Sequence, residues 1–142
     1  MKKWIIAILV ILLSGILFFM IWGQDDQDLG DNYYYLPKYE AIDVGFPGGA
    51  IVYKSTQKHL YSEIKIYGNV KEVNFNKEFI IAIQNADTSY LEKADSDIFE
   101  KNFSNYYIIV KKSDLVYGPY SKEEYIQKRD ELGIPEELKL KE

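Results

Sequence analysis

Residues 55–59 contain the side chains best suited to chemistry that also lie close together in the sequence. Residues 55–58 match the pattern S-x-x-K, in which a lysine helps a serine to act as a nucleophile. Enzymes of that kind also need a later K-T-G strand, and the chain contains no K-T-G. His59 is the single histidine, and the chain has no cysteine to share a metal ion with it. We therefore interpret residues 55–59 as a polar loop.

Acidic residues offer a second kind of chemistry. Asp95, Asp97 and Glu100 carry oxygen ligands of the type that Ca²⁺ prefers. The same residues suit the cap and first turn of a helix, which explains them with fewer assumptions. The sequence has no phosphate-binding G-x-x-x-x-G-K, no zinc-binding H-E-x-x-H and no G-x-S-x-G nucleophile motif. We expect no catalytic, cofactor-binding or metal-binding residues, no cofactor, and a protein that is not an enzyme.

The N-terminal stretch from Trp4 to Trp22 is strongly apolar and contains no charged residue. At about 1.5 Å per helical residue it spans roughly 28 Å, close to the thickness of a bilayer's hydrocarbon core. Tryptophan prefers the water–lipid boundary, and Lys2 and Lys3 favour a cytoplasmic N-terminus. We predict that residues 1–23 form a signal anchor that crosses the cytoplasmic membrane once. Residues 4–22 would contact lipid, and the rest of the chain would lie outside.

A cleaved signal peptide is the alternative, and the protein would then be secreted. The apolar region of a signal peptide is usually about 7–15 residues long and ends at small residues of A-x-A type. Gly23 is the one small residue in a suitable place, and Ile21 fits the pattern poorly. Residues 12–15 resemble the start of a lipid-attachment site, but Ile16 stands where a cysteine is required.

The remaining 119 residues are acidic. Two of the 17 Lys and Arg residues precede the apolar stretch, so 15 remain against 22 Asp and Glu, a net charge of −7. This charge disfavours nucleic-acid binding, which requires clustered basic residues. Residues 24–31 hold four aspartates and no basic residue, and we expect an acidic linker there. We predict one domain over residues 32–142, stabilised without disulfides because the chain has no cysteine.

Two apolar runs predict the centre of this domain. Residues 79–83 and 106–110 are apolar throughout, which is typical of strands covered on both faces. Shorter alternating runs precede them, and residues 68–69, Gly-Asn, are typical of a turn between two such runs. The order of strands and short turns indicates an antiparallel meander.

A helix signal follows the last strand. Ser121 and Glu124 form a capping box, and Gly133 followed by Pro135 is a stop signal. The expected fold class is therefore α+β: an N-terminal transmembrane helix, then an antiparallel β-meander domain with one capped C-terminal helix.

All 13 tyrosines lie after the apolar stretch. Tyrosine is common in strands, where aromatic side chains pair with their neighbours, and this accounts for most of them. Tyrosine is also enriched in the cores of protein interfaces. We predict that Tyr33, Tyr35 and Tyr39, near the first strand and the loop that follows it, contact a partner.

The C-terminal half carries the most specific pattern: a strand at residues 106–112, a strand, Gly-Pro turn and helix start at 117–125, and the helix stop at 132–135. With the strands at 33–35 and 79–84, it resembles a family of small uncharacterised exported bacterial proteins with lipoprotein-like domains. The resemblance covers most of residues 31–140. Many members carry a lipid-bearing cysteine, which this chain lacks. The family has no assigned activity, so the resemblance implies fold and export and adds no site.

Together these features favour a membrane-anchored binding domain outside the cytoplasm that contacts a protein or an envelope component. An immunity or inhibitor protein that neutralises a toxin or hydrolase at the envelope is the alternative, because an acidic domain suits a basic cleft. A third hypothesis is a cryptic enzyme, which a pocket lined by acids or by His59 would support.

Overall fold

The computed structural model describes Ile11, Ser14 and residues 25–85 and 104–141, and the structural statements below concern these residues. Eight strands form two sheets. Sheet A contains β1 (Gln27–Gly30), β2 (Tyr33–Leu36), β3 (Ile51–Lys54) and β4 (Glu63–Ile66). Sheet B contains β5 (Val70–Phe75), β6 (Phe79–Asn85), β7 (Ser104–Val110) and β8 (Leu115–Tyr120). Two helices complete the described part, α2 (Lys38–Asp43) and α3 (Lys122–Leu132).

The prediction of one continuous meander was wrong, because each sheet is a separate four-stranded antiparallel meander. The division falls at Gly68 and Asn69, which both have positive φ angles and turn the chain out of sheet A. The backbone N–H of Asn69 donates to the carbonyl of Gly48 at 2.6 Å. A Cβ atom on Gly48 would lie 3.3 Å from the Cα of Gly68, so two glycines allow the close approach. This contact directs β5 into a second layer.

The core lies between the two sheets. Its buried members come from both layers: Leu29, Tyr33, Ala50, Val52, Ile66, Val70, Ile80, Ala82 and Ile109. Alternate residues of β6 and β7 point to the opposite face of sheet B, where Ile81 and Ile108 are also fully buried. The prediction that both of these strands are covered on both faces is thus confirmed.

Helix α3 covers the outer face of sheet B. The side chain of Ser121 accepts from the backbone N–H of Glu124 at 3.2 Å, and the Glu124 side chain accepts from the N–H of Ser121 at 2.8 Å. Gly133 ends the helix in the left-handed conformation, with φ 65°. The predicted capping box and helix stop are confirmed. Tyr125 packs inward, with its ring stacked on Tyr106 at 4.9 Å.

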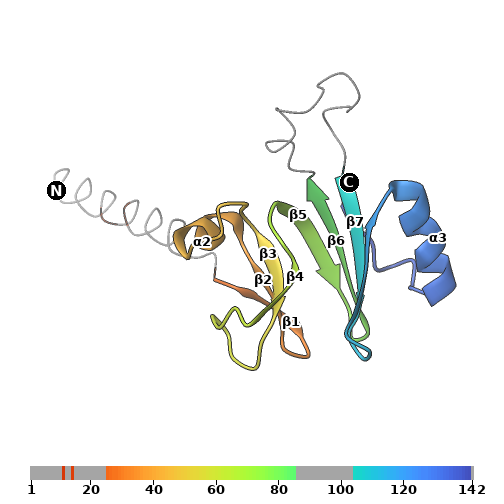
Figure 1. Ribbon diagram of the computed structural model, residues 1–142, viewed down its shortest axis with the longest axis horizontal. Helices are drawn as coiled ribbons and strands as arrows, with labels where there is room; N and C mark the ends of the chain where they lie inside the picture. The colour runs from red at the N-terminus through yellow and green to blue at the C-terminus, as the bar shows by residue number, and fades with distance from the viewer. Residues whose placement is uncertain (1–10, 12–13, 15–24, 86–103, 142) are drawn as a thin grey trace, which may run out of the picture.

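Helix α2 covers the outer face of sheet A, where Ala41 packs against Leu36, Ile51 and Tyr53. Four layers therefore follow one another across the molecule, in the order α2, sheet A, sheet B and α3 (Figure 1). The two helices lie at opposite ends of this stack.

The transmembrane helix of the expected fold class is overturned. No helix in the described part of the chain is long and apolar enough to cross a membrane. Helix α3 has 11 residues, or about 16 Å of helix, against the roughly 30 Å of a hydrocarbon core. The boundary residues Trp4 and Trp22 lie outside the described residues, as does the candidate acidic group at 95–100.

The segment expected to be an acidic linker, residues 24–31, differs from that expectation. It contributes β1, which pairs with β2 through Gln27 and Asp28, and Leu29 enters the core with no exposed surface. Asp26 is also buried. The ordered domain thus begins before residue 32.

Candidate functional site

The outer face of sheet A carries a continuous layer of aromatic rings. Tyr53 stacks on Tyr34 at 5.2 Å and meets Tyr61 edge-on at 5.0 Å. Phe46 meets Tyr61 at 5.3 Å and Tyr67 at 6.3 Å, again edge-on. We call these five residues the aromatic face. Such ring pairs stabilise by about 0.5–1.5 kcal/mol beyond their buried area, so the rings support one another.

Apolar side chains beside this face remain in solvent. Tyr39, Ile42 and Val44, from α2 and its C-terminal cap, are 73%, 45% and 49% exposed, and Tyr67 of the aromatic face is itself 57% exposed. Phe46 connects the aromatic face to α2, because its backbone N–H donates to the carbonyl of Ala41. Tyr39 and Ile42 are three residues apart in α2 and so share one helix face, and exposed apolar residues that lie together are typical of interaction surfaces. We call Tyr39, Ile42, Val44 and Tyr67 the α2 patch.

The Tyr53 hydroxyl fixes one edge of the aromatic face. It donates to the carboxylate of Asp26, whose side chain is only 2% exposed, and accepts from the backbone N–H of His59 at 3.1 Å. Burial and then the hydrogen bond to Asp26 raise the pKa of Tyr53, so it stays a donor. His59 has φ 63°, and the hydrogen bond from its N–H helps hold this uncommon conformation.

Four charged or titratable residues meet at this edge: Asp25, Asp26, Lys58 and His59. We call them the acidic corner. The Lys58 ammonium lies 2.6 Å from one oxygen of Asp25. The two ring nitrogens of His59 lie 3.4 Å from Asp25 and 3.5 Å from Asp26. The hydrogen bond from Lys58 lowers the pKa of Asp25 and raises that of Lys58.

The corner has the donor atoms of a metal site, since one ligand atom from each of Asp25, Asp26 and His59 lies within 4.8 Å of the others. However, Lys58 already neutralises Asp25, and Tyr53 already donates to Asp26. A metal ion would compete with both partners for these carboxylates.

The S-x-x-K residues form no nucleophile and base pair. Ser55 is buried and its Oγ accepts from the N–H of Gln57 at 3.3 Å, while Lys58 turns to Asp25. Residues 55–59 lie in a turn between β3 and β4, so the interpretation as a polar loop is confirmed.

A family model described as "Protein of unknown function (DUF3997)" matches residues 31–142. The chain belongs to the DUF3997 family. The match runs from the β1–β2 turn through both sheets and α3. It confirms the resemblance to a family of unknown function, and its description says nothing of export or lipidation. No curated protein and no solved structure matches the chain.

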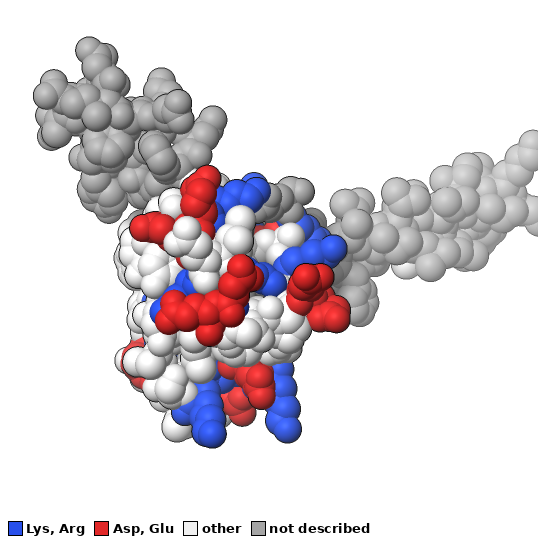
Figure 2. Space-filling model, turned by 90° about the vertical axis from the view of Figure 1, so that its right-hand side faces the viewer, with Lys and Arg blue, Asp and Glu red and all other residues white. Residues whose placement is uncertain are grey.

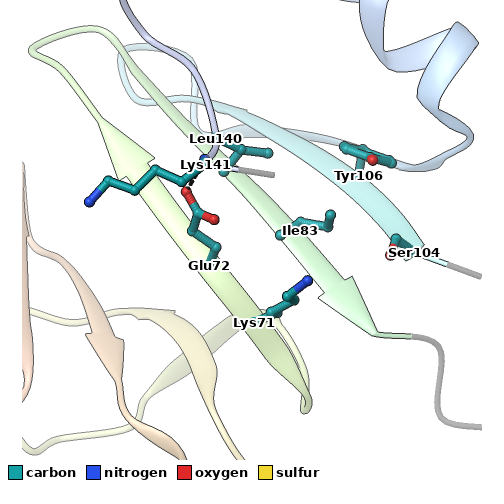
Figure 3. A pocket seen from close by; sticks show the side chains of 7 residues that line it. All are labelled: Lys71, Glu72, Ile83, Ser104, Tyr106, Leu140 and Lys141. Atoms are coloured by element: carbon teal, nitrogen blue, oxygen red, sulfur yellow. Dashed lines mark hydrogen bonds between the residues drawn. The ribbon is translucent and has the colours of Figure 1, made fainter. Parts of the chain in front are cut away.

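The DUF3997 domain also has a hollow of about 200 Å³ on the outer face of sheet B (Figure 3). Lys71, Glu72, Ile83, Ser104, Tyr106, Leu140 and Lys141 line it. The carboxylate of Glu72 accepts from the backbone N–H of Lys141 and so holds the C-terminal tail (Figure 3). The hollow thus serves to dock the C-terminal tail, and the carboxylate of Glu72 already accepts the hydrogen bond from Lys141.

A wider hollow of about 540 Å³ opens near the β1–β2 and β7–β8 turns. Lys54, Lys77, Lys111, Lys112, Asp31, Asn32 and Glu78 line it. Lys54 pairs with Asp114 at 3.1 Å, and Lys111 donates to the backbone carbonyls of Leu29 and Asn76. Two of its four lysines thus serve the fold of the DUF3997 domain.

The three tyrosines predicted to contact a partner lie in different environments. Tyr33 has no exposed surface, and Tyr35 is half-buried between the sheets with its hydroxyl 3.4 Å from the carbonyl of Val70. Their neighbour Tyr34 points the other way, into the aromatic face, because side chains alternate along a strand. Tyr39 is 73% exposed, and its role in a contact stays a prediction.

Sequence reasoning missed the acidic corner and α2. The corner joins residues about 33 positions apart through the hydroxyl of Tyr53, which no spacing reveals. Helix α2 has six residues, and its N-cap is Pro37, which offers no side-chain acceptor. The one available signal was the pair Tyr39 and Ile42, three residues apart and therefore on one helix face.

Proposed function

We propose that this domain is a binding module without catalytic activity, and that it contacts a protein partner or envelope component through the α2 patch. The observation that carries the proposal is the exposure of Tyr39, Ile42 and Val44 together with that of Tyr67, which belongs to the aromatic face. Burying such side chains against a partner contributes about 25 cal/mol per Å² of apolar surface. Rigid aromatic groups add affinity at little cost in conformational entropy.

The opposite end of the molecule, around α3, has a charged surface. Figure 2 looks at the α3 side, where acidic and basic side chains intermingle over the surface. Helix α3 still exposes one large apolar residue, Ile126, at 48%, close to the 45% of Ile42. Because both isoleucines lie on helices with similar exposure, Ile126 is a matched control for Ile42.

The experiment is quantitative affinity capture from the native host with the wild-type chain, Ile42→Ser and Ile126→Ser. We expect at least one protein to be captured by the wild type and by Ile126→Ser but not by Ile42→Ser. With that protein purified, Ile42→Ser should bind it about tenfold more weakly than the wild type does. Equal capture by all three chains would contradict the proposal, provided that both variants melt like the wild type.

An immunity or inhibitor role is the second candidate. The net negative charge of the chain after the apolar stretch favours it, since an acidic domain suits a toxin or hydrolase with a basic cleft. Binding that weakens steeply from 50 to 500 mM salt supports this role. Binding that is insensitive to salt supports the apolar α2 patch alone.

We also propose that the domain acts outside the cytoplasm. The support lies in the sequence, where Lys2 and Lys3 precede the apolar stretch at residues 4–22. Protease added to intact spheroplasts should degrade an exported domain and spare one that stays in the cytoplasm. Mass spectrometry of the native N-terminus would show whether residues 1–23 are removed.

A further inference from the structure

The wider hollow, of about 540 Å³, lies where turns from both sheets meet. The β1–β2, β5–β6 and β7–β8 turns come together at one end of the two sheets, the lower end in Figure 1. Lys54 at the end of β3 and Lys111 directly after β7 complete the lining. Pockets that hold small molecules commonly measure about 300–1,000 Å³, so this hollow has room for one.

Positive charge gathers in this hollow although the chain as a whole carries a net charge of −5. The lining holds four lysines and two acids. Lys54 is paired with Asp114, which lies outside the lining and also binds Lys65. Lys77 and Lys112 are exposed, and no ion pair between described residues includes either of them. The hollow therefore offers two exposed ammonium groups to an anion.

Lys111 adds a third ammonium group, and the fold holds this one in place. The residue is 7% exposed, and its ammonium donates to the carbonyls of Leu29 and Asn76. Gly30 makes room for it, because a Cβ atom at that position would lie 3.1 Å from the Lys111 nitrogen. An ammonium carries three N–H groups, so one of them has no hydrogen-bond acceptor among the described residues. An anion in the hollow can accept from it.

We infer that this hollow binds a phosphate group, either as free phosphate or as a phosphate monoester, through Lys77, Lys111 and Lys112. Lysine is a common phosphate ligand that acts as a point charge. The second pKa of a phosphate monoester is about 6, so the group is mostly a dianion at neutral pH. A dianion attracts the lysines more strongly than a carboxylate, which carries a single charge. The hollow shares no residue with the α2 patch, so the inference goes beyond the proposed function and does not depend on it.

The test titrates the ¹⁵N-labelled full chain, in a non-ionic detergent at pH 7.5 and constant ionic strength, with inorganic phosphate, glycerol 3-phosphate and acetate. We expect both phosphates to shift the amide signals of residues 30–32, 76–78 and 111–112, and acetate to bind about fivefold more weakly. Burial lowers the pKa of Lys111, and bound phosphate should raise it, which the ¹³Cε signal of Lys111 reports.

A further titration, with dihexanoyl phosphatidic acid, identifies the source of the phosphate group. Tighter binding than that of glycerol 3-phosphate would support a lipid headgroup as the ligand. Equal affinity for the two would support a soluble phosphate. In either case the same amide signals should shift, because the same lysines bind the phosphate.

The double variant Lys77→Gln with Lys112→Gln should bind glycerol 3-phosphate about tenfold more weakly than the wild type. The matched control is Lys71→Gln with Lys139→Gln, which removes two exposed lysines outside the hollow and changes the net charge equally. It should bind less than twofold more weakly. Equal weakening in both double variants, shifts centred elsewhere, or acetate that binds as tightly as phosphate would overturn the inference.

Discussion

The hydroxyl of Tyr33 in β2 donates a hydrogen bond to the carboxylate of Asp114 in the β7–β8 turn, and this bond ties sheet A to sheet B. The same carboxylate receives Lys65 at 2.8 Å and Lys54 at 3.1 Å. Asp114 has φ 57°, a conformation that aspartate tolerates better than most residues. One side chain in a turn thus connects three strands of the other sheet.

Acid should weaken this connection. Burial alone would raise the pKa of Asp114, but hydrogen bonds from Lys65, Tyr33 and Lys54 outweigh it and lower the pKa to about 2. Because the folded pKa lies below the unfolded value of 3.8, the stabilisation is complete above pH 3.8 and is lost as the pH falls towards 2. Because the Asp114 side chain is 35% exposed, solvent screens its contacts, and we expect the ionised carboxylate to contribute about 1 kcal/mol to the free energy of unfolding.

Urea unfolding of the wild type and Asp114→Asn from pH 6 to pH 2 measures this effect. The two free energies of unfolding should differ by about 1 kcal/mol at pH 6 and converge near pH 2. Asp130→Asn in α3 is the control and should keep the wild-type profile. A constant difference between wild type and Asp114→Asn at every pH would exclude the titration of Asp114 as its cause.

Lys111 should be essential for stability although it is a lysine. It is 7% exposed, and its ammonium donates to the carbonyls of Leu29 and Asn76. Burial lowers its pKa, which the carboxylates of Asp31 and Asp28 partly offset. Lys111→Met removes the donor to the buried carbonyl of Leu29 and to the partly buried carbonyl of Asn76, and should lower the free energy of unfolding by about 2–3 kcal/mol in urea. Lys112→Met, the exposed neighbour, should change stability by less than about 0.5 kcal/mol; similar losses in both would argue against the buried contacts.

The capping box of α3 gives a third prediction. Ser121→Ala removes the acceptor for the N–H of Glu124 and should lower the free energy of unfolding by about 1 kcal/mol. Ser113→Ala, in a turn outside any helix, is the control and should have little effect. Thermal melts followed by circular dichroism compare the two, and an equal loss would show that the cap contributes nothing specific.

Tyr53→Phe should loosen the acidic corner. The variant keeps the ring that stacks on Tyr34 but leaves the buried carboxylate of Asp26 without its donor, a loss of about 1–3 kcal/mol. Amide exchange at His59 should also accelerate, because its N–H loses its acceptor. Tyr35→Phe removes a hydroxyl with only a 3.4 Å contact and should leave His59 unchanged. Unchanged exchange at His59 in Tyr53→Phe would mean that this hydroxyl does not hold the loop.

The sequence predicted β6, β7 and α3 because the residues that specify each of them are neighbours in the chain. An apolar run at residues 79–83 needs cover on both faces wherever it lies, and Ser121 and Glu124 meet within one turn of helix. The division into two sheets was not predictable in this way. It depends on the contact between Gly48 and Gly68, and these two glycines are twenty residues apart.

Only part of the candidate site could be predicted from the sequence, for a similar reason. Tyr39 is exposed on α2, where the sequence predicted a loop, whereas Tyr33 and Tyr35 face the core because of the phase of one short strand. A shift of one residue would exchange them with Tyr34. The acidic corner requires the three-dimensional position of Tyr53, which pairs with β2 and β4 on either side.

The most direct test of the central claim is site-specific photo-cross-linking in the native host. Benzoylphenylalanine replaces Ile42 in the α2 patch in one strain and Ile126 on α3 in another. We predict a discrete protein adduct from position 42 and none from position 126. Adducts from position 126 alone, or the same adducts from both positions, would contradict the claim that the α2 patch is the binding surface.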